Sequence, residues 1–161
     1  MPPLFALTPV WTGLRLYSAA PSLLERVVPS STSKNGVADE IFDMMGYGLP
    51  PGTIVGTQAW SMHRDSSVFA SPDAFIPERW LVGPSTTQED LTRMAAYMMP
   101  FGTGTRVCGG QNLALMMLKL ALAAFVRNFE IRAPAETTDL SMEIKDSFVC
   151  LFSLPELPYF R

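Results

Sequence analysis

The sequence predicts a mostly helical α+β fold, in which one long helix is accompanied by small antiparallel sheets. The long helix is predicted over residues 111–128, where apolar side chains recur at helical spacing. The sheets are predicted by short apolar runs that glycine, proline and polar residues separate. No internal repeat is visible along the 161 residues, and this length fits one domain or a large piece of one.

Short elements are expected in the first part of the chain. A short helix is predicted from Thr12 and ends before Pro21, because proline cannot continue a helix. Residues 23–28 predict a strand. Two more strands are expected within residues 46–59, joined by a Pro-Pro-Gly turn at residues 50–52.

The second part is expected to be irregular around the long helix. A helix of one or two turns is predicted within residues 60–72, followed by an irregular segment at 73–81 and a polar, solvated loop at 82–90. The long helix is expected to be buried. Short strands should follow it at residues 129–133, 140–144 and 147–152.

Composition and charge narrow the class of protein. Hydrophobic residues make up 48% of the chain and charged residues 17%, so some of the surface is expected to be covered by protein outside this chain. The net charge of −3 argues against a nucleic-acid partner, which usually requires a basic face.

Two cysteines, Cys108 and Cys150, provide no disulfide framework, so we expect a reducing compartment. The apolar N-terminus has two early prolines and no basic region, so it makes a poor signal peptide. The longest apolar run, residues 113–126, contains Lys119 and is shorter than the roughly 18 residues that a membrane span needs.

The segment PFGTGTRVCGG, residues 100–110, has unusual chemistry for a loop. It lacks the glycine spacing of a dinucleotide-binding loop and the lysine of a phosphate-binding loop. A zinc site needs several Cys or His ligands, and catalysis by a Cys-His pair would have to recruit the sole histidine, His63, without a supporting motif.

A single thiolate ligand, for a metal centre that brings its other ligands with it, remains as the explanation. Haem is such a centre, since the porphyrin leaves an axial position for the protein. The glycines allow the backbone to approach a flat macrocycle. The amides that begin the following helix favour a thiolate at Cys108. Arg106 can pair with an acidic edge group, and Phe101 can shield the sulfur from water.

The segment FGTGTRVCGG resembles the F-x-x-G-x-R-x-C-x-G signature of the cytochrome P450 family. It matches the fixed positions at Phe101, Gly104, Arg106, Cys108 and Gly110. The segments PPGT, HRD and PERW follow one another in the order found in eukaryotic, and especially fungal microsomal, members.

The resemblance covers nearly the whole chain and implies its domain organisation. Residues 12–161 are expected to form the C-terminal, haem-binding part of the cytochrome P450 fold, with the haem loop at 100–110 and its helix at 111–128. Residues 1–11 are expected to be an atypical N-terminal segment. The family's oxygen-activating helix, and the anchor that holds full-length relatives in the endoplasmic reticulum membrane, are not expected in this chain.

One motif of the family is broken. TGLRLY resembles the E-x-x-R helix, with Arg15 as the arginine, but Thr12 stands at the glutamate position. In the family this glutamate pairs with the equivalents of Arg15 and Arg79 in a buried charged triad. Removing one partner of a buried ion pair costs roughly 3–5 kcal/mol. Either the substitution is compensated elsewhere, or the first dozen residues are not family sequence, which we favour.

Further roles are implied by position within the family. Arg26, together with Arg106, is expected to hold the haem propionates. Residues 19–24 and a tip near residues 147–148 are expected to contact the substrate. From the residues themselves, His63 is predicted to have a local hydrogen-bonded or surface role instead of a ligand role.

The resemblance implies a haem-thiolate monooxygenase with haem b (iron protoporphyrin IX), an apolar small-molecule substrate and an NADPH-dependent reductase as electron donor. No nucleic-acid partner is expected. We expect the chain alone to be inactive. Two alternatives remain open: a truncated, non-catalytic fragment with weak or no haem binding, and a separate haem-carrying or regulatory module.

Overall fold

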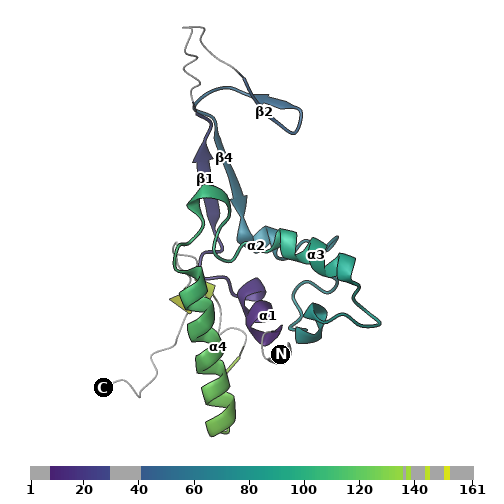
Figure 1. Ribbon diagram of the computed structural model, residues 1–161. Coiled ribbons are helices and arrows are strands. Elements are labelled where there is room, and N and C mark those ends of the chain that lie inside the picture. The colour runs from purple at the N-terminus through teal and green to yellow at the C-terminus, as the bar shows by residue number, and fades with distance from the viewer. Residues whose placement is uncertain (1–7, 30–40, 136, 139–143, 146–150, 153–161) are drawn as a thin grey trace, which may run out of the picture. The chain divides into compact units, whose positions relative to one another are not determined.

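The computed structural model describes residues 8–29, 41–135, 137–138, 144–145 and 151–152. The chain divides into two compact units. One unit consists of residues 23–58, and the other joins residues 1–22 to residues 59–161. The predicted α+β class, with helices and small antiparallel sheets, is confirmed (Figure 1).

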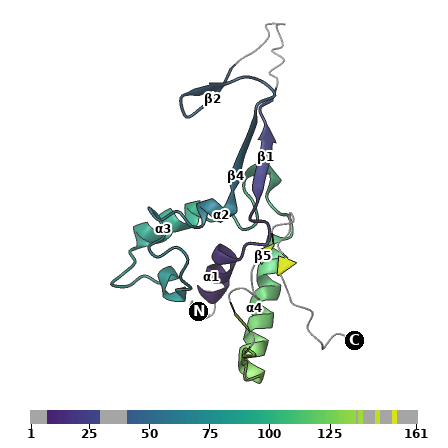
Figure 2. The same cartoon turned by 180° about the vertical axis from the view of Figure 1, so that it is seen from behind.

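The smaller unit consists of two antiparallel strand pairs. Strand β1 (Leu23–Val27) pairs with β4 (Ile54–Gln58), and the two lie side by side in both views (Figures 1 and 2). Strand β2 (Phe42–Met44) pairs with β3 (Tyr47–Leu49).

The pairing corrects one sequence-based expectation. Both strands predicted within residues 46–59 are present, but β3 and β4 pair with different partners, not with each other. Between them Gly52 has a φ of +83°, and its N–H donates to the carbonyl of Val28 at 2.9 Å. The Pro-Pro-Gly turn therefore directs the chain onto β1, which lies further back in the sequence.

The larger unit begins with helix α1 (Thr8–Leu16), which starts four residues before the predicted position. Its buried side chains include Val10, Thr12, Arg15 and Leu16. Ala59 and Phe69 are fully buried in the same unit. This small core thus combines apolar residues with a threonine and an arginine.

Two short helices follow in the larger unit. Helix α2 (Ala59–Met62) confirms the predicted short helix, and the 3₁₀ helix η2 (Pro77–Trp80) lies in the segment expected to be irregular. The ring of Trp80 lies 6.2 Å from that of Trp11 and 6.4 Å from that of Phe69, centroid to centroid. The contact with Trp11 joins η2 to α1, and the contact with Phe69 joins η2 to the segment that follows α2.

The polar loop predicted at residues 82–90 is partly wrong, because helix α3 (Gln88–Tyr97) begins inside it. Thr87 and Asp90 form a capping box. The Thr87 side chain accepts a hydrogen bond from the Asp90 N–H at 3.1 Å, and the Asp90 carboxylate accepts one from the Thr87 N–H at 2.8 Å. Both bonds satisfy amides at the helix terminus that would otherwise lack a partner.

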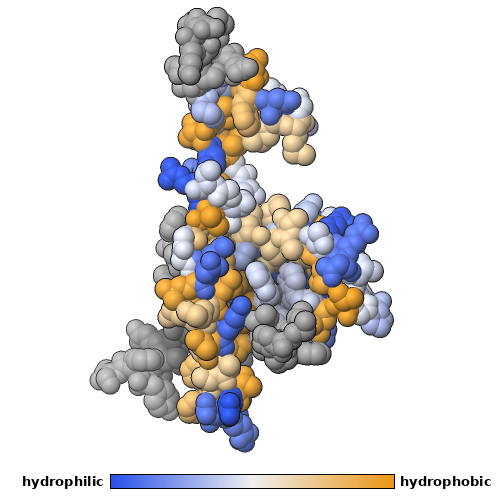
Figure 3. All heavy atoms as spheres, viewed as in Figure 1, coloured by the Kyte–Doolittle hydropathy of each residue, from blue (hydrophilic) through white to orange (hydrophobic). Residues whose placement is uncertain are grey.

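Helix α4 (Gln111–Asn128) has the bounds that the sequence predicts. The expectation that it is buried is wrong for this chain, since none of its residues is buried. Its apolar side chains gather on the surface (Figure 3), and the exposed ones are Leu113, Met116, Met117, Leu118, Leu120, Phe125 and Val126. Burial depends on what packs against a helix, which its periodicity does not reveal.

The last segments agree with the sequence only in part. Residues 129–133 form no strand, contrary to expectation. Strands β5 (Ile144–Lys145) and β6 (Leu151–Phe152) pair in antiparallel fashion within the other two predicted regions. The remaining residues of those regions, with the tip at 147–148 and Cys150, lie outside the described residues. None of the helices in the described parts combines the length and the hydropathy that a membrane span requires.

Candidate functional site

The cysteine loop, residues 100–110, lies between α3 and α4. Hydrogen bonds between backbone groups hold its conformation. The Gly102 N–H donates to the Met99 carbonyl at 3.0 Å, and the Cys108 N–H donates to the Phe101 carbonyl at 2.9 Å. Gly102 and Gly104 have φ values of +74° and +70°, which side chains with a Cβ rarely adopt. The glycine at the signature position 104 is therefore required by the backbone.

Cys108 presents an exposed thiol immediately before helix α4. Its carbonyl accepts the N–H of Gln111, the first helical residue, at 3.3 Å. Gly110 caps the helix without a side-chain hydrogen bond, so no side chain competes for the amides of the first turn. The positive end of the helix dipole thus lies close to the sulfur, where it stabilises negative charge.

The surroundings of Cys108 fit a single axial ligand to a flat group. A Cβ added at Gly104 or Gly109 would meet no atom within 4 Å, so the loop leaves open space beside it. Among the described residues, no group of three or more His, Cys, Asp or Glu side chains could hold a metal ion by itself. Within the loop, Cys108 is the residue whose side chain is of a type that commonly ligates metals.

The two arginines expected to bind propionates lie in different units. Arg106 ends the 3₁₀ turn η3 (Gly104–Arg106), is exposed, and forms neither of the two ion pairs found among the described residues. Arg26 lies in β1, is exposed, and donates from Nη1 to the Glu25 carbonyl at 2.7 Å. The structure brings Arg106 into the cysteine loop, and the shared role of the two arginines stays a prediction.

Arg15, expected to lack its carboxylate partner, is held by backbone carbonyls. Its side chain is fully buried, and Nη1 donates to the carbonyls of His63, at 2.8 Å, and Pro72. Nη2 donates to the carbonyl of Ala74 at 3.1 Å. The guanidinium also lies over the Phe69 ring, 5.2 Å from its centroid, where it gains a cation–π interaction.

This arrangement compensates only part of the missing charge. The Nε atoms of Arg15 and of Arg79 are both buried without a hydrogen-bond partner in the part of the chain that the structure describes. Burial, followed by the positive charges of Arg79 and Arg64, lowers the pKa of Arg15 to about 10, although Asp73 opposes the shift. Burial also lowers the pKa of Arg79, whose Nη2 donates to the carbonyl of Ser71 at 3.1 Å.

Thr12 uses its hydroxyl where the resemblance places a carboxylate. The hydroxyl donates to the carbonyl of Thr8 at 2.8 Å and accepts the indole N–H of Trp80 at 3.2 Å. Both Thr12 and Arg15 are fully buried on the same face of α1. Thr12 therefore has a defined structural role in joining α1 to η2.

His63 is hydrogen-bonded, as predicted, but the prediction of a local or surface role is wrong, because the ring is buried and bonds to residues far away in the sequence. It is fully buried, its Nδ1 lies 3.1 Å from the Arg15 carbonyl oxygen, and its Nε2 accepts the N–H of Met99 at 2.8 Å. Burial lowers the pKa of His63 to about 4, with a smaller lowering by the charges of Arg15 and Arg64, while the hydrogen bond to the Arg15 carbonyl raises it. Sequence reasoning missed the contact with Met99, which joins segments 36 residues apart.

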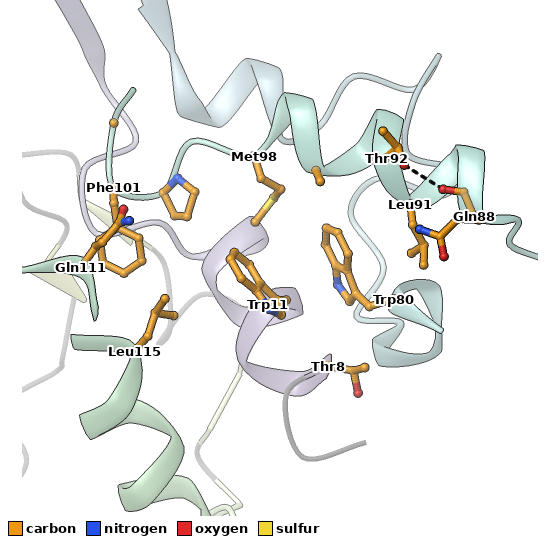
Figure 4. A pocket seen from close by; sticks show the side chains of 13 residues that line it. Thr8, Trp11, Trp80, Gln88, Leu91, Thr92, Met98, Phe101, Gln111 and Leu115 are labelled. Atoms are coloured by element: carbon orange, nitrogen blue, oxygen red, sulfur yellow. Dashed lines mark hydrogen bonds between the residues drawn. The ribbon is translucent and has the colours of Figure 1, made fainter. Parts of the chain in front are cut away.

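A pocket of about 580 Å³ opens beside the cysteine loop in the larger unit. Figure 4 shows Trp11 and Trp80 on one part of its wall, and Phe101, Gln111 and Leu115 on another. The pocket thus borders the side of the loop from which Phe101 extends.

Comparisons with known proteins assign the chain to a family. The cytochrome P450 family matches residues 11–160, so the chain belongs to the cytochrome P450 family. Thr12 lies inside the matched region. The assignment of residues 1–11 as an atypical segment stays a prediction.

Fungal and plant proteins are among the curated relatives. A cytochrome P450 monooxygenase of Annulohypoxylon moriforme is 40% identical over 138 residues, which is 84% of this chain and 26% of the relative. One from Aspergillus niger is 40% identical over 116 residues, covering 72% of this chain and 20% of the relative. Cytochrome P450 82C3 of Arabidopsis thaliana is 38% identical over 119 residues, covering 74% of this chain and 21% of the relative. The chain thus spans about a quarter or less of the length of these relatives.

Proposed function

We propose that this chain forms the haem-binding part of a haem-thiolate monooxygenase, with Cys108 as the axial ligand of haem b. The observation that carries the proposal is the exposed Cys108 thiol, placed by a glycine loop directly before the α4 N-terminus. Membership of the cytochrome P450 family supports it. When bound, haem iron supplies the activation of dioxygen, and thiolate donation favours cleavage of the O–O bond.

We propose a separate role in haem binding for each of these residues. Cys108 would bind the iron, and Arg106 would donate hydrogen bonds to a propionate, with Arg26 as the proposed second donor. With haem bound, Phe101 would cover the sulfur, which is exposed in this chain, and keep water away from it. Gly104 and Gly110 keep the backbone thin where the macrocycle would approach, and at Gly110 a Cβ would lie 3.9 Å from the Cys108 sulfur.

The proposed partners follow from the family. We propose an apolar small-molecule substrate and an NADPH-dependent reductase as electron donor. Four fungal proteins that are 35–40% identical to this chain are named cytochrome P450 monooxygenases, which supports an oxidative reaction without indicating the substrate.

The ligand assignment is tested by the absorbance spectrum of the reduced, haem-loaded chain with carbon monoxide. We expect Cys108→Ala to abolish the thiolate-type band, while Cys150→Ala, the matched control at the other cysteine, leaves it intact. A thiolate-type band that persists in Cys108→Ala would refute the assignment. Haem content and product formation, measured on the same sample, separate a monooxygenase from a haem carrier and from a fragment that binds no haem.

A further inference from the structure

We propose that His63 is a positioning residue for the cysteine loop, acting through the backbone of Met99. The proposal rests on the proposed function of that loop as the haem-thiolate site. It adds a residue outside the loop and outside the signature, 45 positions before Cys108 in the sequence. The observation that supports it is the pair of hydrogen bonds that the buried ring makes to Arg15 and Met99.

The partners of the two ring nitrogens define the tautomer. The Met99 backbone N–H can only donate, so Nε2 must be the unprotonated nitrogen that accepts it. The Arg15 carbonyl can only accept, so Nδ1 must carry the proton and donate. His63 is therefore a neutral imidazole with both nitrogens satisfied, which is the requirement for burying it without a charged partner.

The ring is anchored firmly on its Nδ1 side. Arg15 Nη1 donates to the His63 carbonyl at 2.8 Å, while His63 Nδ1–H donates to the Arg15 carbonyl. The His63 N–H also donates at 2.8 Å to the carbonyl of Ala59, the first residue of α2. These bonds fix the ring against α1 and α2, so that Nε2 is a fixed acceptor when the chain returns from α3.

The Nε2 side sets where the cysteine loop begins. Met99 is buried, and its N–H donates to His63 Nε2 at 2.8 Å, so removing Nε2 removes this acceptor. Its carbonyl accepts the Gly102 N–H at 3.0 Å, which closes the first turn of the loop. Inside that turn, the Phe101 carbonyl accepts the Cys108 N–H at 2.9 Å. A shift of Met99 is thus passed by successive hydrogen bonds to the backbone of Cys108.

Two substitutions separate this role from simple filling of the core. In His63→Asn the side-chain amide can still donate to the Arg15 carbonyl, but it is too short to reach Met99. In His63→Gln the longer side chain can place its amide oxygen where Nε2 lies and accept the Met99 N–H. Positioning by Nε2 predicts that Gln preserves the loop better than Asn, whereas loss of packing predicts similar damage in both.

The first measurement needs no substitution and no haem. Because His63 is the only histidine, nitrogen NMR of the isotopically labelled chain reports its tautomer without ambiguity. We expect a protonated Nδ1 and a hydrogen-bonded, unprotonated Nε2. A protonated Nε2, or two tautomers in rapid exchange, would overturn the proposal.

The second measurement is amide hydrogen exchange at Met99, Gly102 and Cys108 in the parent chain and both variants. We expect exchange at Met99 to accelerate about tenfold or more in His63→Asn, since a hydrogen bond to a buried amide is lost, and much less in His63→Gln. Amides of α4, which make no bond to His63, serve as the internal control. Equal acceleration at Met99 in the two variants would overturn the proposal, as would no acceleration in His63→Asn.

The haem-loaded chain then distinguishes this proposal from the function on which it rests. We expect His63→Asn to raise the fraction of the carbon monoxide complex that lacks the thiolate-type band, with rescue in His63→Gln. If the parent chain lacks that band, the proposed function fails, and hydrogen exchange alone decides whether His63 positions the loop. If the parent shows the band and both variants retain it equally, the positioning role fails while the function stands.

Discussion

Replacing Thr12 by glutamate should strengthen the core around α1. Two buried guanidinium nitrogens, Nε of Arg15 and Nε of Arg79, have no hydrogen-bond acceptor among the described residues. Thr12 lies one helical turn before Arg15, and its hydroxyl accepts from Trp80, the neighbour of Arg79. A carboxylate at position 12 is therefore close to both arginines, and it would supply the acceptors that the threonine hydroxyl cannot.

The expected gain follows from opposing terms. Each buried donor without a partner costs about 1–3 kcal/mol, and two such donors are present. The lowering of the Arg15 pKa to about 10 by burial and by the neighbouring positive charges shows that the charged side chain is under-compensated in this core. Desolvation of the new carboxylate, at several kcal/mol, offsets much of this. We expect a net gain of about 1–3 kcal/mol over the uncharged control.

Thr12→Gln is the matched control, because the glutamine side chain is as long as the glutamate side chain and carries no charge. Both substitutions remove the same hydroxyl contacts of Thr12. The assay is urea unfolding of both variants across a range of pH. Glutamate should exceed glutamine at neutral pH. The arginines lower the pKa of the new carboxylate in the folded chain below its pKa in the unfolded chain. Its contribution to stability is therefore fully present above the unfolded-state pKa and is lost as the pH falls through the folded-state pKa. Equal stability of the two variants at neutral pH would refute the reasoning.

Three further predictions concern single side chains. Arg106→Leu should speed haem loss without changing the thiolate-type spectrum, since charge-assisted hydrogen bonds contribute roughly 1.5–3 kcal/mol; equal haem retention in variant and parent would count against this role. Burial lowers the pKa of His63 to about 4 in the folded chain, so the unfolded chain binds a proton at His63 first as the pH falls. The contribution of neutral His63 to the free energy of unfolding should therefore fall by about 3 kcal/mol between pH 6.5 and 4. Urea unfolding at several pH values measures that loss, which should be absent in His63→Gln. Thr87→Ala should cost about 1 kcal/mol of α3 stability, seen as faster amide exchange in its first turn, whereas Thr92→Ala, within the same helix, should not produce that loss.

Short-range sequence patterns were sufficient to predict the bounds of the long helix and the family of this protein. The bounds of α4 follow from helical periodicity after a Gly-Gly pair, and the signature that ends at Gly110 identified the family. Helix α3 was missed although a signal for it existed, since Thr87 and Asp90 have the spacing of a capping box. These features depend on residues a few positions apart, which is why sequence alone can reveal them.

Tertiary structure decided the features that join distant segments. Three such features connect residues far apart in the chain. They are the pairing of β4 with β1 instead of β3, the backbone carbonyls that bind Arg15, and the hydrogen bond from Met99 to His63. The missing glutamate at Thr12 could be seen in the sequence, but the backbone oxygens that replace part of it could not, because every residue carries the same carbonyl. Only the folded path of the chain determines which carbonyls meet a buried charge.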